Sequence, residues 1–196
     1  MACVAKNLKI AETRWNYCAL FMGPKSIALK ALVWLILCVP TFGAGLDAMK
    51  LFVRLRFWNV PEITTTGLAS WLTDDRRPKP FLLDVRTPAE YAVSHLPGAK
   101  RIDPDGRITQ TLDQFPPDRP IVTYCSVGYR SAELAQRLIA AGRKNIYNME
   151  GSIFQWANEG RPLEQNGKPV NTVHPYNDSW GKLLDSRLRA KVPPVE

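Results

Sequence analysis

The chain has 196 residues, which is enough for one domain of ordinary size with about fifty residues to spare. Its hydrophobic fraction of 45% and charged fraction of 22% exclude a disordered or collagen-like chain. The net charge of +8 lies mostly at the front, where residues 1–57 hold eight Lys and Arg against two acidic residues; the rest of the chain holds eighteen against sixteen. Because nucleic-acid binding needs a basic face on the domain itself, we expect no nucleic-acid partner.

The basic front of the chain contains an apolar segment at residues 27–46. Its length suits a membrane span, and its densest part, residues 31–39, also has the length of the apolar region of a signal peptide. A buried helix is a third interpretation, because the segment has no polar face. The positive charges that precede it favour an N-terminus on the cytoplasmic side. We therefore expect a membrane-anchored or exported protein with its domain on the non-cytoplasmic side, or a cytoplasmic protein if the true start is Met49.

We divide the chain into a leader at residues 1–57, a domain at residues 58–163 and a C-terminal extension at residues 164–196. In the domain, apolar periodicity and capping signals predict short strands that alternate with helices. A helix begins at Pro88, because Thr87 and Glu90 have the spacing of a capping box and proline suits the first helical position.

The other expected elements follow the same alternation. In chain order they are a strand at 62–63, a helix at 65–72, strands at 81–85 and 99–102, a helical turn at 112–115, a strand at 121–124, a helix at 131–141, a strand at 145–148, a helix at 153–158 and a tail helix at 180–188. This alternation implies an α/β fold with a doubly wound parallel sheet and helices on both faces. Ligands of such sheets bind beyond the carboxyl ends of the strands.

Cys125 is the candidate nucleophile of the domain. The other three cysteines all precede residue 45, so no disulfide framework fits the chain. A lone cysteine is more often an inert core residue than a nucleophile, and its neighbours decide between the two. Here the cysteine ends a buried strand, precedes a helix, and starts a loop that continues as Ser126, Val127, Gly128, Tyr129 and Arg130.

This loop favours a thiolate at Cys125. Backbone N–H groups in a tight turn between a strand and a helix form an anion-binding site, and the helix N-terminus adds positive potential. Gly128 permits a positive φ, and Arg130 adds a fixed charge or orients the loop. A thiolate held by such donors is a nucleophile, and the same donors bind an anionic substrate or leaving group.

Three motifs follow one another in fixed order along the domain. The sequence Asp84-Val85-Arg86, followed by Glu90-Tyr91 and by His95-Leu96-Pro97-Gly98-Ala99, is similar to the first signature of the rhodanese superfamily. The loop from Cys125 to Ser131 resembles its active loop, C-x-x-G-x-R-S, and Glu150-Gly151 through Trp156 resembles its closing helix. The resemblance covers about residues 58–163. Ser94 and Ser152 stand where the family pattern has glycine, which affects local turn geometry.

The resemblance implies a rhodanese-like fold and a two-step sulfur transfer. The thiolate of Cys125 takes a sulfane sulfur from a small donor, holds it as a persulfide, and passes it to an external acceptor such as cyanide, a small thiol or a partner protein. Ser126 and Val127 stand where well-known thiosulfate-using members often carry a basic residue, which argues against thiosulfate as the preferred donor. We expect no cofactor and no metal.

Three further residues lie at strand ends or in the first signature. Asp84 and Arg86 line the rim of the site or form a structural salt bridge, and we favour the structural role. For His95 we also favour a structural role over a place at the rim of the site. Its position in the motif suggests a hydrogen bond that fixes the turn before Pro97 and Gly98.

Two other functions fit parts of the pattern. A rhodanese-fold module that binds a partner or senses persulfides, with negligible turnover, is the first alternative. The second is a phosphatase or arsenate reductase of the same fold, whose loop typically has five residues between cysteine and arginine. Only four residues separate Cys125 from Arg130, and Tyr124 replaces the usual preceding histidine, so we expect sulfur chemistry.

Overall fold

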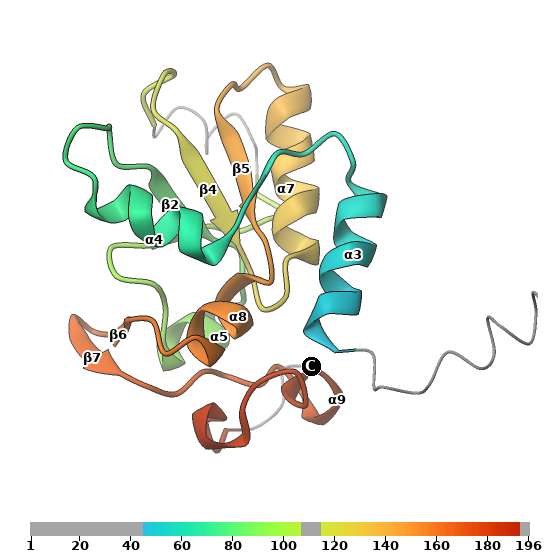
Figure 1. Cartoon of the computed structure of the whole chain (residues 1–196), viewed down its shortest axis with the longest axis vertical. Coiled ribbons are helices and arrows are strands. Elements are labelled where there is room, and N and C mark those ends of the chain that lie inside the picture. Colours follow the sequence, from blue (N-terminus) through green and yellow to red (C-terminus); the bar gives the residue numbers. More distant parts are fainter. Residues whose placement is uncertain (1–44, 107–114, 193–196) are drawn as a thin grey trace, which may run out of the picture. The chain divides into compact units, whose positions relative to one another are not determined.

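A five-stranded parallel sheet lies at the centre of the residues that the computed structural model describes, 45–106 and 115–192 (Figure 1). The strands pair in parallel in the order β1-β5-β4-β2-β3, which places β4 in the middle. They are β1 (Glu62–Ile63), β2 (Phe81–Asp84), β3 (Lys100–Arg101), β4 (Ile121–Tyr124) and β5 (Ile146–Met149).

Helices cover both faces of this sheet (Figure 1). The helices α4 (Thr65–Thr73) and α8 (Ser152–Asn158) pack on one face, and α3 (Leu46–Arg56) and α7 (Tyr129–Ala140) pack on the other. The predicted α/β class, with a parallel sheet between helical layers, is confirmed.

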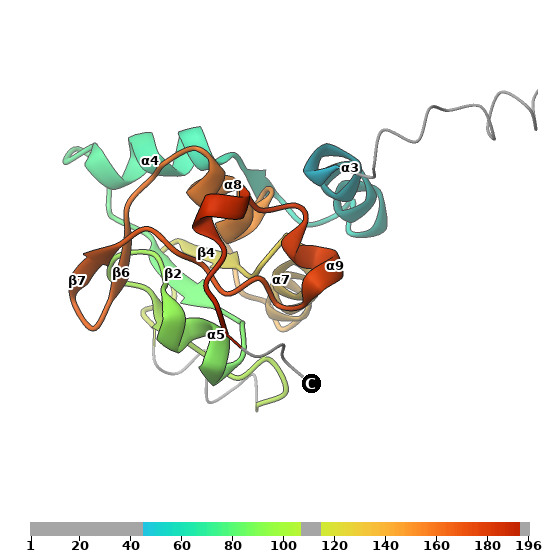
Figure 2. The ribbon, with the colours of Figure 1, turned by 90° about the horizontal axis from the view of Figure 1, so that it is seen from below.

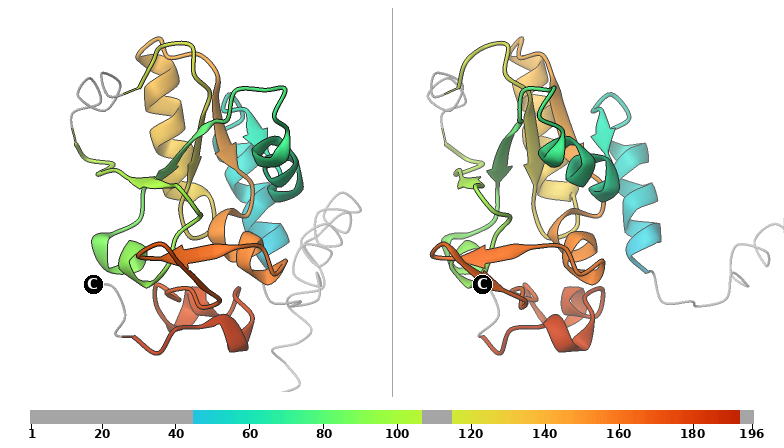
Figure 3. Two further views of the ribbon diagram at one scale, coloured as in Figure 1. Left: turned by 90° about the vertical axis from the view of Figure 1, so that its left-hand side faces the viewer. Right: turned by 60° about the vertical axis from the view of Figure 1, so that its left-hand side comes forward.

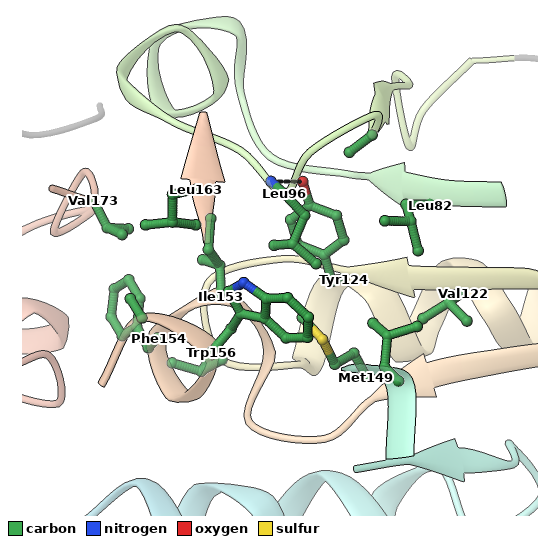
Figure 4. Packing of buried hydrophobic residues seen from close by; sticks show 14 of the residues in the cluster. Leu82, Leu96, Val122, Tyr124, Met149, Ile153, Phe154, Trp156, Leu163 and Val173 are labelled. Atoms are coloured by element: carbon green, nitrogen blue, oxygen red, sulfur yellow. Dashed lines mark hydrogen bonds between the residues drawn. The ribbon is translucent and has the colours of Figure 1, made fainter. Parts of the chain in front are cut away.

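The side chains of β4 alternate between the two faces. Val122 and Tyr124 belong to the apolar cluster under α4 and α8, shown in Figure 4, where the backbone N–H of Leu96 donates a hydrogen bond of 3.1 Å to the Tyr124 hydroxyl. Ile121 and Cys125 belong to the cluster under α3 and α7. Because β-strand side chains alternate, Cys125 leaves the end of β4 on the side of α3 and α7.

The helix α5 (Pro88–Val93) begins with the predicted capping box. The hydroxyl of Thr87 accepts a hydrogen bond from the backbone N–H of Glu90, at 3.2 Å, and the Glu90 carboxylate accepts one from the backbone N–H of Thr87, at 3.0 Å. The helix ends at Val93, before Pro97.

The C-terminal extension runs across the carboxyl ends of the strands. It forms a hairpin of β6 (Leu163–Gln165) and β7 (Lys168–Val170), then α9 (Asp178–Gly181) and the 3-10 turn η1 (Ser186–Leu188). Figure 2 looks onto this edge of the sheet, and Figure 3 shows from two further directions that the hairpin and α9 lie on the same side of it. Val173 and Leu184 of the extension are buried in the cluster under α4 and α8.

The single helix predicted at residues 180–188 is wrong. The side chain of Asn177 accepts hydrogen bonds from the backbone N–H groups of Ser179 and Trp180, at 3.1 and 3.0 Å, and so starts the helical turn earlier. Asp185 then starts a separate turn by accepting a hydrogen bond of 3.0 Å from the backbone N–H of Arg187. Two local caps therefore divide the segment into two short turns.

Residues 46–57, which the sequence divided from the domain, form α3 and its C-cap and belong to the same compact unit as the sheet. Val53 and Phe57 are buried in the cluster that α3 shares with α7. Phe57 also meets Tyr129 edge to face, with ring centroids 5.1 Å apart. The domain therefore gains a helix in front of its first strand.

The apolar segment at residues 27–46 lies outside the described residues except for its last two positions. Within 45–106 and 115–192, no helix combines the length and the apolar character that a membrane crossing needs. The helical turn predicted at residues 112–115 also lies outside the described residues, apart from Phe115.

Candidate active site

Cys125 follows β4 at the carboxyl edge of the sheet, and backbone contacts with the start of α8 fix its position. Its N–H donates a hydrogen bond of 3.1 Å to the hydroxyl of Ser152, and its carbonyl accepts one of 3.1 Å from the N–H of Ile153. Ser152 has φ 51°, a region that favours glycine, which is the residue that the family pattern has there. Its hydroxyl gives the site a backbone hydrogen bond that a glycine lacks.

The sulfur of Cys125 lies at the N-terminus of α7 and accepts a hydrogen bond of 3.1 Å from the backbone N–H of Gly128. Gly128 has φ 106°, the positive value that the sequence led us to expect. Burial on its own raises the pKa of the thiol, but the charge of Arg130 and hydrogen bonds from Ser131 and Gly128 outweigh burial and lower that pKa from its usual value. The arrangement therefore favours a thiolate.

Arg130 is held in place by a carboxylate that lies forty residues earlier in the chain. Its guanidinium donates two hydrogen bonds to Glu90, at 2.8 and 3.0 Å, and a third to the hydroxyl of Ser126, at 3.0 Å. The Glu90 side chain is fully buried. Burial raises its pKa, but Arg130, together with Thr87 and Ser126, holds that pKa at about 2. Glu90 is therefore an anion that orients Arg130.

The sequence assigned Glu90 only to the capping box, and its second role was missed. One carboxylate performs both, since Oε2 accepts from Thr87 and both oxygens accept from Arg130. Its place in the family-like pattern was the only available signal.

Asp84 and Arg86 form a fully buried salt bridge of 2.6 Å. The guanidinium of Arg86 also donates a hydrogen bond of 2.6 Å to the carbonyl of Ser94, which ties β2 to the end of α5. Neither side chain lines the cavity described below. Their contacts join two elements of the fold, and the structural role of the pair stays a prediction.

His95 lies beside the turn at Pro97 and Gly98, away from the sulfur. Its Nδ1 is 3.1 Å from the carbonyl of Tyr91, and its Nε2 is 3.4 Å from the carboxylate of Glu164. The same carboxylate accepts a hydrogen bond of 3.0 Å from the N–H of Gly98. His95 therefore connects α5, the turn and β6, and does not line the cavity.

A cavity of about 420 Å³ lies against Cys125. The active loop contributes part of its wall, and α3 and the C-terminal extension contribute the rest. The residues that line it are Met49, Phe52, Cys125, Ser126, Val127, Tyr129, Arg130, Tyr176 and Trp180. Of the loop residues singled out in the sequence, all but Gly128 line the cavity, and Gly128 contacts the sulfur through its N–H.

Four of the lining residues lie outside the domain predicted from the sequence. Met49 and Phe52 come from α3, and Tyr176 and Trp180 come from the extension. Phe52 stacks on Tyr129, with ring centroids 6.1 Å apart, and the Tyr176 ring lies 5.2 Å from the Arg130 guanidinium carbon. No local pattern in the sequence indicates these contacts.

Comparison with known proteins agrees with this geometry. The family model described as "Rhodanese-like domain" matches residues 66–159. The chain is 35% identical over 104 residues to a protein named "Sulfurtransferase" from Allochromatium vinosum, covering 53% of this chain and 94% of that protein. The chain belongs to the rhodanese-like domain family.

Other relatives of this rhodanese-like protein are larger. It is 37% identical over 102 residues to a probable adenylyltransferase/sulfurtransferase, MoeZ, of Mycobacterium tuberculosis, covering 51% of this chain and 25% of that protein. It is 33% identical over 132 residues to a tRNA uridine(34) hydroxylase of Sodalis glossinidius, covering 63% of this chain and 34% of that protein. A thiosulfate sulfurtransferase structure from Pseudomonas aeruginosa shares the fold, with a TM-score of 0.53 and 21% identity over 63% of this chain and 23% of that one.

Proposed function

We propose that this rhodanese-like protein is a sulfurtransferase that carries sulfane sulfur as a persulfide on Cys125 and passes it to an external acceptor. The observation that carries the proposal is the hydrogen bond of 3.1 Å from the N–H of Gly128 to the Cys125 sulfur, at the wall of an open cavity. A reactive thiol needs both a stabilised thiolate and access, and this position supplies both. The relative named "Sulfurtransferase" supports the same reaction class.

In the first step, the Cys125 thiolate attacks the outer sulfur of the donor. A new S–S bond forms at Cys125, and the bond between that sulfur and the rest of the donor breaks. With thiosulfate the leaving group is sulfite, which departs with the bonding electron pair. The N–H of Gly128 and the guanidinium of Arg130 lie close enough to the thiolate to stabilise the negative charge of the resulting persulfide.

In the second step, a nucleophile attacks the outer sulfur of the persulfide and regenerates the Cys125 thiolate. Cyanide leaves as thiocyanate, and a thiol leaves as a new persulfide. Cys125 is the one cysteine in the described part of the chain, so no nearby thiol is available there to form a disulfide with it. We therefore propose an external acceptor, which is cyanide, a small thiol or a thiol of a partner protein.

Mass spectrometry of the full-length protein tests this proposal. The protein is exposed separately to thiosulfate, mercaptopyruvate and a small organic persulfide, each in excess. We expect a gain of one sulfur on Cys125 with at least one donor, and its loss on addition of cyanide or a thiol. Cys125→Ser is the control and gains no sulfur at this position.

The possible results of this experiment distinguish the sulfurtransferase from the two alternative functions. A persulfide that forms but turns over no faster than free cysteine supports the persulfide-sensing module instead. Absence of an adduct with every donor contradicts sulfur carriage. Hydrolysis of an aryl phosphate that depends on Cys125 points to a phosphatase, against which the four-residue spacing between Cys125 and Arg130 argues.

A further inference from the structure

The cavity above Cys125 has little net positive charge. Arg130 is the one charged side chain among its lining residues in the described part of the chain. Its guanidinium is already paired through two hydrogen bonds with the buried carboxylate of Glu90. An arginine neutralised in this way offers a second anion much less attraction than a free one.

The low positive charge of the cavity affects which sulfur donor can bind there. Thiosulfate carries two negative charges, and it must approach a thiolate that carries a third. Moving a doubly charged ion out of water costs far more than moving a singly charged one, unless cationic groups compensate for the lost hydration. The loop offers N–H donors for one sulfur, and the remaining wall offers no unpaired cation among the described residues.

The rest of the wall is apolar and largely aromatic. Phe52 and Met49 come from α3, and Trp180 comes from α9. Phe52 and Trp180 are partly exposed, at 51% and 36%, so a bound ligand can bury more of their apolar surface. A volume of about 420 Å³ lies in the range of sites for organic ligands and exceeds the needs of a small inorganic ion.

We propose that the cavity selects sulfane-sulfur donors whose leaving group, a sulfinate or a thiolate, carries an apolar alkyl or aryl substituent, and that Phe52 and Trp180 bind this substituent. The proposal rests on the sulfur transfer proposed above and names its donor class. In this proposal, α3 and α9 determine which substrate binds. Both helices lie outside the matched residues 66–159.

The transfer from such a donor balances without a further reagent. With an aryl thiosulfonate, the Cys125 thiolate attacks the terminal sulfur, and the S–S bond of the donor breaks. The aryl sulfinate leaves with the electron pair, and Cys125 holds the persulfide anion. With an organic persulfide, the leaving group is the corresponding thiolate, and the proton stays on the transferred sulfur.

Three donors with a common reacting group test the proposal: benzenethiosulfonate, methanethiosulfonate and thiosulfate. The rate of thiocyanate formation by the full-length protein is divided by the uncatalysed rate of each donor with cyanide. We expect the normalised kcat/KM to rise from thiosulfate to methanethiosulfonate to benzenethiosulfonate, with about tenfold or more between the first and the last.

Substitutions in the cavity wall test which residues are responsible for the donor preference. Phe52→Ala and Trp180→Ala are each expected to lower kcat/KM for benzenethiosulfonate about tenfold, with less than a threefold change for thiosulfate. Leu55→Ala and Trp58→Ala are the matched controls, because Leu55 lies on α3 and Trp58 just beyond it, and both are exposed at 68% and 84% without lining the cavity. Both controls are expected to match the unaltered protein with every donor.

Two results would contradict the proposed preference for donors with an apolar group. One is a normalised kcat/KM for thiosulfate that equals or exceeds that for benzenethiosulfonate. The other is an equal loss for all three donors in Phe52→Ala and Trp180→Ala while circular dichroism shows an intact fold. Either result leaves sulfur carriage standing, whereas failure of all three donors to load Cys125 contradicts the proposed function itself.

Discussion

The reactivity of Cys125 depends on a balance between burial and nearby positive charge. The thiol is 1% exposed, which alone raises its pKa, and Arg130 is the first of the influences that lower it. The shift therefore depends on a side chain whose own position depends on Glu90. Two substitutions separate these contributions.

Arg130→Met is expected to raise the pKa of Cys125, because it removes the cation that lowers this pKa and leaves the Glu90 anion without its arginine. The pH dependence of alkylation by iodoacetamide measures this pKa, since only the thiolate reacts. Lys144→Met removes one positive charge from an exposed position and serves as the control. An unchanged midpoint in Arg130→Met would mean that the loop N–H groups alone hold the thiolate.

Glu90 links stability to pH. Its pKa of about 2 in the folded protein lies below the ordinary value of 4.5, so the unfolded chain takes up the proton first as the pH falls. The stabilisation is thus fully present above about pH 4.5 and is lost between there and about pH 2. Its size is on the order of 3 kcal/mol.

Glu90→Gln is expected to lower the free energy of unfolding at pH 7 by about 2 kcal/mol, because it leaves Arg130 without its anion. It also flattens the acid dependence, since a glutamine does not titrate. Urea unfolding at pH 7, 4 and 3 measures both effects. A variant that loses stability at pH 7 yet keeps the full acid dependence would assign that dependence to another carboxylate.

The contacts that could be predicted from the sequence are those between residues that lie close along the chain. Cys125 and Gly128 are three positions apart, and a strand, a loop and a helix in fixed order define their contact. Glu90 and Arg130 are forty positions apart, and Glu90 already had a local explanation as the end of a capping box. The capping box already accounted for Glu90, so nothing in the sequence near Glu90 indicated that it also pairs with Arg130.

A strong local signal was sufficient to predict some elements, whereas one element with such a signal and one that packs by tertiary contacts were both missed. The start of α5 follows from its proline and capping box. The β6–β7 hairpin was missed although Asn166 and Gly167 form its turn with φ 50° and 73°, the Asn-Gly pattern typical of two-residue hairpins. The close approach of Gly181, at the end of α9, to Pro175 is a tertiary contact that no periodicity in the sequence shows.

That contact makes Gly181 sensitive to substitution. A Cβ atom at this position would lie 2.9 Å from the Cβ of Pro175, a ring carbon that cannot move aside freely. We expect Gly181→Ala to cost about 1–3 kcal/mol and to displace the turn that carries Trp180. The measurements are thermal unfolding and the kcat/KM for benzenethiosulfonate.

Ser179→Ala is the matched control, because its side chain is exposed on the same turn. We expect no change in either measurement for this variant. If Gly181→Ala unfolds earlier but transfers sulfur from benzenethiosulfonate at the unaltered rate, α9 supports the fold without shaping the cavity.

The described part of the molecule is larger than the matched domain, and the additional parts meet at the cavity beside Cys125. The family model ends at residue 159, yet Val173 and Leu184 are buried in the same core as α8. On the other face, Val53 and Phe57 of the preceding segment are buried beside α7. The cavity could not be predicted from the sequence, because it needs residues from three separate regions of the chain.

The apolar segment at residues 27–46 reaches, in sequence, the helix that lines this cavity. We retain the proposal that it anchors or exports the protein, with the domain on the non-cytoplasmic side. We expect a protein tagged at its C-terminus to sediment with membranes, or to be recovered from the far side with a shortened chain. Protease added to intact cells or vesicles then distinguishes the two sides.

Leu35→Arg together with Leu37→Arg tests whether the apolar character of the segment is responsible. Each arginine at the centre of a span costs about 2.5–3.5 kcal/mol of insertion free energy, so the double variant is expected to lose membrane association or export while keeping sulfur loading on Cys125. Lys6→Arg with Lys9→Arg keeps the charge and serves as the control. A full-length, unaltered protein that remains in the cytosol contradicts the proposal. A cytosolic product that begins at Met49 is the outcome expected for the cytoplasmic alternative.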